Sequence, residues 1–138
     1  MSLLINKNSS EKPKSLLLTK ADADKDKPTR YFSDKQEKDV AKTFQGKQTA
    51  NSGATAFIKG DVLLDQFLIE CKTKTSHADS MSIKREWLEK NRKEAAFMGK
   101  KYSALAFNFG PDEKNYYIID EILFQELVAH LIDSKNEE

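Results

Sequence analysis

The chain has 138 residues, of which 38% are hydrophobic and 33% are charged, and its formal net charge is +1. This length suggests one domain that can bury a core, and the small net charge argues against a passive basic coat for nucleic acid. The single cysteine excludes an intrachain disulfide, no apolar run approaches the ~18 residues of a membrane span, and the first residues lack a signal-peptide pattern. We therefore expect a cytoplasmic protein without a membrane partner.

Charge is unevenly distributed along the sequence. Residues 1–30 carry seven Lys or Arg against four Asp or Glu, residues 82–101 carry seven against three, and residues 112–138 carry two against eight. We expect the first two regions, but not the third, to face a polyanion. The segment 1–29, rich in Lys, Ser and Asp, is typical of a flexible basic arm. Residues 30–138 then form the folded domain.

The first predicted helix begins near Ser33 and ends at Phe44. Ser33 and Gln36 fit a capping box, and Gly46 can end the helix. The following residues, 47–55, are small and polar, so a loop or an irregular edge is expected there.

A β-hairpin is predicted next. Two apolar runs, Val62–Leu64 and Phe67–Ile69, are separated by the turn-forming pair Asp65 and Gln66. A hairpin of this register would bring Asp61, at the start of its first strand, close to Glu70 in its second strand.

The rest of the chain is expected to form a helix over residues 83–98, strands over 103–109 and 116–119, and a last helix capped by Asp120. The last helix is expected to pack inward through Leu123, Leu127, Val128, Leu131 and Ile132. The resulting order, α-β-β-α-β-β-α, predicts an α/β fold with a mixed central sheet flanked by helices.

Candidate chemistry centres on Asp61, Glu70 and Lys72. Side chains alternate along a strand, so Glu70 and Lys72 share one face while Cys71 points to the core side. Two carboxylates beside a lysine suit Mg²⁺, which prefers oxygen ligands and keeps several waters. The backbone carbonyl of Cys71 could add a third ligand. Spacing alone leaves open a second interpretation, in which Glu70 and Lys72 form an exposed, ion-paired strand face.

The surrounding chain resembles the PD-(D/E)XK nuclease superfamily, and within it the small Holliday junction resolvases of archaea and phages. The resemblance covers about residues 31–110. It includes Glu37 on the first helix, Asp61 at the start of a strand, and Glu70-Cys71-Lys72 on the next strand. Ser52 and Gly53 match a Ser-Gly pair that precedes the aspartate in archaeal-type resolvases. Gly60 stands where the family name has proline.

The resemblance implies a restriction-endonuclease-like fold and a Mg²⁺-dependent, structure-selective DNA endonuclease, with Mn²⁺ able to substitute. A metal-activated water would hydrolyse the phosphodiester, leaving a 5′-phosphate and a 3′-hydroxyl. The implied catalytic residues are Glu37, Asp61, Glu70 and Lys72, with Glu37 contacting metal directly or through water. The implied partners are branched DNA, such as a four-way junction, and a second copy in a homodimer; without a Gly-rich phosphate loop, no nucleotide cofactor is expected.

Two other functions stay open: a restriction or repair endonuclease with the same motif, and a catalytically silent DNA-binding module of the same fold. Candidate DNA contacts are polar or basic residues near the motif, which we expect to recognise backbone and shape rather than bases. They are Ser52, Lys47, Lys59, Lys74, Lys84 and Arg85. Each of these also fits an ordinary surface residue.

Overall fold

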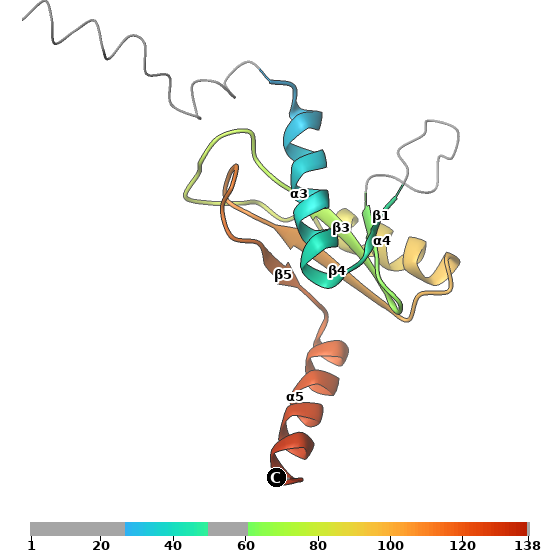
Figure 1. Cartoon of the computed structure of the whole chain (residues 1–138). Helices are drawn as coiled ribbons and strands as arrows, with labels where there is room; N and C mark the ends of the chain where they lie inside the picture. Colours follow the sequence, from blue (N-terminus) through green and yellow to red (C-terminus); the bar gives the residue numbers. More distant parts are fainter. Residues whose placement is uncertain (1–26, 50–60, 138) are drawn as a thin grey trace, which may run out of the picture.

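The structure, a computed structural model, describes residues 27–49 and 61–137 (Figure 1). These residues form three helices and a five-strand sheet. In chain order the elements are α3 (Thr29–Phe44), β1 (Lys47–Gln48), β2 (Asp61–Leu63), β3 (Phe67–Lys72), α4 (Arg85–Phe97), β4 (Tyr102–Phe107), β5 (Tyr116–Ile118) and α5 (Glu121–Asn136). The predicted N-terminal arm lies almost wholly outside the described residues.

The sheet is open and mixed, with the strand order β1-β2-β3-β4-β5. All neighbouring pairs are antiparallel except β3 and β4, which are parallel and joined through α4. The predicted α/β fold with a mixed sheet is therefore confirmed. The element order differs in one place, because Lys47 and Gln48 form the edge strand β1 where a loop or an irregular edge was expected.

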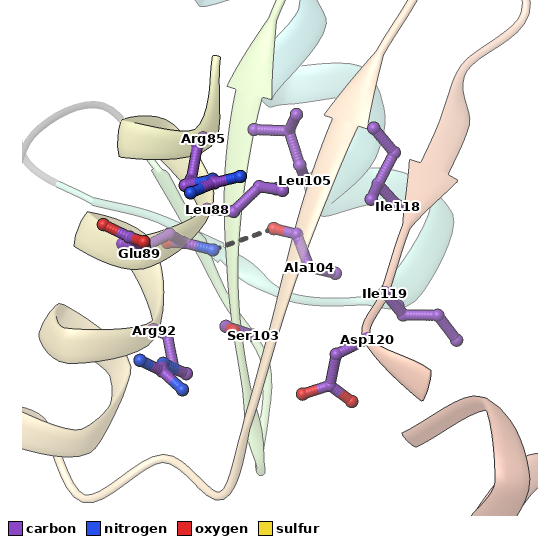
Figure 2. Close-up of a pocket in the computed structure, with 11 residues that line it drawn as sticks. Arg85, Leu88, Glu89, Arg92, Ser103, Ala104, Leu105, Ile118, Ile119 and Asp120 are labelled. Carbon is purple, nitrogen blue, oxygen red and sulfur yellow. Dashed lines mark hydrogen bonds between the residues drawn. The ribbon is translucent and has the colours of Figure 1, made fainter. Parts of the chain in front are cut away.

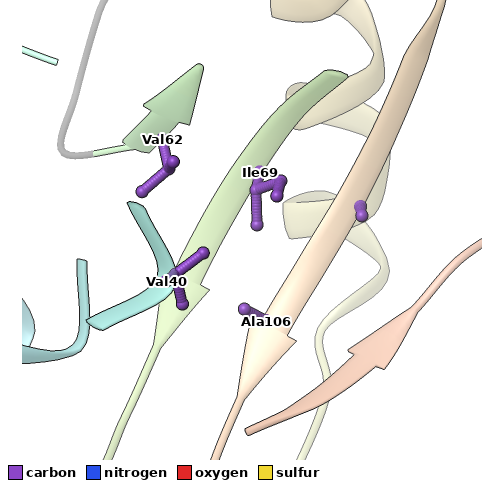
Figure 3. Close-up of a cluster of buried hydrophobic side chains, with 5 residues drawn as sticks. Val40, Val62, Ile69 and Ala106 are labelled. Carbon is purple, nitrogen blue, oxygen red and sulfur yellow. The ribbon is translucent and has the colours of Figure 1, made fainter. Parts of the chain in front are cut away.

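One face of the sheet packs on α3. Val40 of α3 is fully buried against Val62 and Ile69 of the hairpin and Ala106 of β4 (Figure 3). Cys71 also packs against this cluster, as its place in the strand predicted. The predicted turn, Asp65-Gln66, joins β2 and β3. The alternation of buried and partly polar faces thus fixes the hairpin register.

The other face is covered in part by α4, which lies on the side of the sheet away from α3 (Figure 1). Asn91, in the middle of α4, is buried, and its Nδ2 donates to the carbonyl oxygen of Ala104 at 3.0 Å. Leu68 and Leu105 form the buried floor under this helix.

Two helix starts differ from the prediction. The helix α3 begins at Thr29 after Pro28, and Ser33 donates its hydroxyl to the Thr29 carbonyl at 3.4 Å instead of capping. Proline before the first helical residue needs no amide hydrogen there, so the helix can start a full turn earlier. The helix α4 begins at Arg85, two residues after the predicted start, and no side chain caps it.

The last helix is the main departure from the sequence prediction. Asp120 caps α5 as expected, because its Oδ1 accepts from the Leu123 amide at 2.8 Å. Leu123 is buried, but the other four side chains predicted to pack inward are 38–68% exposed: Leu127, Val128, Leu131 and Ile132. The spacing of the apolar residues predicted the helix correctly, but it did not predict which of their side chains would be buried. None of the helices in the described residues is long and apolar enough to cross a membrane.

Candidate active site

The hairpin places two acids directly opposite each other. Asp61 begins β2 and pairs in register with Glu70 of β3, so their side chains lie on the same face of the sheet. Asp61 is only 4% exposed, and Glu70 is partly buried. This proximity was predicted from the hairpin. The burial of both acids argues against the exposed, ion-paired strand face.

A lysine completes the group. Lys72 lies two residues after Glu70 on the same face, and its Nζ is 3.4 Å from Glu70 Oε1. The Lys72 ammonium also lies 4.5 Å from the centre of the Trp87 ring, an attractive cation–π contact. Lys84 lies 5.8 Å from the same ring. Trp87 of α4 is half-buried, and its ring lies against the Lys72 ammonium.

Thr49 fixes the main chain of Asp61. Its amide donates to the Asp61 carbonyl oxygen at 2.8 Å, and its side-chain oxygen accepts from the Asp61 amide at 2.8 Å. The neighbouring Gln48 donates from Nε2 to Glu37 Oε2 at 2.9 Å and to Asp34 Oδ1 at 2.6 Å. The sequence offered no signal for either role, since Thr49 and Gln48 belong to a small, polar segment that looked like a loop.

The site is electrostatically unfavourable for carboxylates. Burial, together with the nearby charges of Glu70, Glu94 and Glu37, raises the pKa of Asp61 to about 8. Burial also raises the pKa of Glu70, although Lys72 opposes the change. Glu94, on α4, was not among the predicted site residues, yet its charge acts on both acids. A positive charge at this face would therefore stabilise the ionised pair.

Glu37, on the helix α3, is less directly part of the site than Asp61 and Glu70. Glu37 is buried, and burial raises its pKa while the hydrogen bond from Gln48 lowers it. No group of three or more acidic, His or Cys side chains converges as a ready-made metal cage in residues 27–49 and 61–137. The structure thus brings Asp61, Glu70 and Lys72 together, and leaves Glu37 as a neighbour bound to Gln48.

Asp61 and Glu70 nevertheless fit a Mg²⁺ ion. Mg²⁺ is commonly held by one or two carboxylates and keeps several waters, so a third acid is not required. Glu70 Oε2 is buried and has no hydrogen-bond partner among the described residues, which leaves a hard oxygen donor available. The main chain of Cys71 lies between Glu70 and Lys72. Its thiol faces the core, and burial raises the thiol pKa, so it is not a nucleophile.

The predicted DNA contacts are only partly placed. Ser52 and Lys59 lie outside the described residues. Lys47 is exposed on the edge strand β1, and Lys74 follows β3. Lys84 lies near the ring of Trp87, which Lys72 also contacts. The remaining candidate, Arg85, lines a separate hollow over β4 and the end of β5 (Figure 2).

Comparison with protein families, curated proteins and solved structures finds no match to this chain. The assignment of function therefore depends on the geometry of Asp61, Glu70 and Lys72 and on the sequence motif that contains them.

Proposed function

We propose that this protein is a Mg²⁺-dependent, structure-selective DNA endonuclease of the PD-(D/E)XK type that acts on branched DNA such as Holliday junctions. One observation carries the proposal: a buried carboxylate and a partly buried one face each other across a hairpin, with a lysine ammonium 3.4 Å from the second. Burying two acids beside one lysine is costly unless a cation balances them. A metal site at the catalytic centre supplies that cation.

Each residue has a distinct role in phosphodiester hydrolysis. Asp61 and Glu70 would hold Mg²⁺, with the Cys71 carbonyl as a third oxygen and Glu37 acting through Gln48 or a water. The ion, when bound, lowers the pKa of a coordinated water and offsets charge on the phosphate. Lys72 carries three donors on a fixed ammonium, so it can orient the attacking water and stabilise the extra negative charge of the transition state.

Selectivity for branched DNA follows from the resemblance to junction resolvases and agrees with the placement of basic residues. Lys47 and Lys84 lie at the edge strand and on the loop before α4, where they can contact phosphates. Neither position suggests reading of base edges. A junction requires two symmetric cuts, which a C2 homodimer supplies.

A catalytically silent DNA-binding module is the second candidate from a different class. Such a module has no need to bury two carboxylates beside a lysine. The burial of Asp61 and Glu70 therefore favours the enzyme. A restriction or repair endonuclease would share the same three residues and differ only in its substrate.

Lys72→Ala tests the catalytic assignment. With Mg²⁺ we expect nicking of DNA by the wild type and a loss of roughly 10²-fold or more in the variant, because a transition-state charge contact is removed. Lys93→Ala, an exposed lysine on α4, is the matched control and should cleave normally. Far-ultraviolet circular dichroism would verify that both variants fold. Equal cleavage by folded Lys72→Ala and wild type would exclude this catalytic centre.

A further inference from the structure

The helix α5 leaves a wide apolar face exposed. Its apolar residues repeat at helical spacing and form one stripe, consisting of Leu123, Phe124, Leu127, Val128, Leu131 and Ile132. Leu123 is buried, and the other five are 38–68% exposed. Figure 1 shows α5 extending away from the sheet after β5. Most of the stability of a helix in a protein comes from packing of its apolar face, so an exposed stripe on the 16 residues of α5 favours a cover.

A matching hollow lies at the base of the same helix. It has a volume of about 390 Å³ and opens between α4 and the end of β5 (Figure 2). Its apolar lining comes from Leu88 of α4, Leu105 of β4, and Ile118 and Ile119. Leu105 and Ile118 are register partners on the face that α4 covers only in part. A sheet face normally carries a second layer, and here that layer is incomplete.

The chain's own α5 is held away from this hollow. Only Ile119 and Asp120 separate β5 from α5, and Asp120 already caps the helix. Tyr102 donates its hydroxyl to Glu126 Oε2 at 2.6 Å, which fixes the second turn of the helix beside the start of β4. The distal half of α5 therefore projects beyond its own sheet. A short link between a sheet and an unpacked helix favours exchange between two copies.

The α4 side of the hollow and the end of α5 carry opposite net charge. On the α4 side of the hollow stand Arg85, Glu89 and Arg92, which leave that side net basic, and Asp120 lies on the opposite side (Figure 2). The segment that contains α5 has two basic and eight acidic residues. Asp133 and Glu137 follow the apolar stripe. A partner helix that fits the hollow should be apolar on one side and acidic at its end, and α5 meets both conditions.

We propose that the distal half of α5, residues 127–136, docks into the hollow of a second copy of this chain, whose α5 docks in return. The contact is isologous, since each copy gives one helix and receives one. Both the stripe and the hollow of each copy are then buried. Their burial contributes to the ~800 Å² of surface per partner that a stable interface covers. The inference does not depend on the proposed nuclease activity, although two paired copies would present two candidate active sites.

Sedimentation of the full chain without DNA tests the dimer. The wild type should have a sedimentation-derived mass of twice the 15.7 kDa of one chain. Leu131→Asp should give monomers, because a buried carboxylate replaces a docked leucine. Phe97→Asp is the matched control, since Phe97 is 78% exposed at the end of α4 and belongs to neither surface. A monomeric wild type, or a Leu131→Asp variant that remains dimeric, would overturn the proposal.

Cysteine cross-linking tests the geometry of the pairing. A Leu88→Cys chain and a Leu131→Cys chain are mixed and oxidised, and a heterodimer joined by a disulfide is expected. The native Cys71 can stay, because its burial against the core keeps it unreactive. A Leu88→Cys and Phe97→Cys mixture should not cross-link. Bonding only between two Leu131→Cys chains, or within one doubly substituted chain, would contradict docking in the partner's hollow.

Discussion

The electrostatics of the site depend most on the carboxyl group of Asp61. It is nearly inaccessible, and its pKa rises to about 8 from a reference of 3.8 because of burial and neighbouring acids. Between these values the unfolded chain has released the proton while the folded chain keeps it. Without metal, the contribution of Asp61 to stability is therefore lost as pH rises from about 4 to about 8.

Asp61→Asn should consequently stabilise the metal-free protein at neutral pH. In EDTA at pH 7.5 we expect the variant to gain on the order of 5 kcal/mol over wild type, with the difference shrinking toward pH 4. Thermal unfolding across this pH range measures the effect. Asp65→Asn, at the exposed turn of the same hairpin, should show no such trend. A variant no more stable than wild type at pH 7.5 would contradict the account of the buried acid.

At the scale of elements, the turn between α3 and β1 positions the acid-bearing strand. Gln45 ends α3 in the left-handed region with φ of 55°, and Gly46 follows. A Cβ on Gly46 would lie 2.7 Å from the Leu63 carbonyl oxygen and 3.1 Å from Val62 Cγ1. Only glycine allows α3 to approach β2 this closely, and β2 begins with Asp61.

Gly46→Ala is therefore expected to lower the free energy of unfolding by about 1–3 kcal/mol, since the overpacked turn must move. Urea unfolding measures the loss. The neighbouring change Gln45→Gly should leave stability unchanged or raise it slightly, because glycine adopts a positive φ without strain. Equal stability of Gly46→Ala and wild type would mean that the close approach does not constrain the hairpin.

The elements also show what the sequence could predict. The alternation of side chains along each strand and a polar turn were enough to predict the hairpin and the pairing of Asp61 with Glu70. They also predicted that the Cys71 side chain faces the core. The strand β1 could not be predicted, because Lys47 and Gln48 have no apolar pattern. They form a strand by pairing with β2, which is distant in the sequence. Thr49 and Glu94 act on the site through tertiary contacts. Local spacing carries no information on such contacts.

At the scale of the whole molecule, the sequence predicted the mixed α/β sheet but not how α5 sits. The periodicity of the last helix identifies an apolar face, and a periodicity cannot distinguish a core from a surface between copies. The exposed stripe and the hollow beside Leu88 and Ile118 favour pairing of two chains. Such a pairing would suit an enzyme that cuts a branched substrate twice.

The central claim is that Asp61, Glu70 and Lys72 form a Mg²⁺-dependent endonuclease centre selective for branched DNA. Its most direct test is cleavage of a labelled four-way junction beside a matched duplex, with Mg²⁺ or with EDTA, by wild type and Asp61→Asn. We predict paired, symmetric cuts in the junction alone, abolished by EDTA and by Asp61→Asn. Equal cutting of both substrates would reject branch selectivity, and a folded wild type that cuts neither substrate with Mg²⁺ or Mn²⁺ would contradict the nuclease assignment itself.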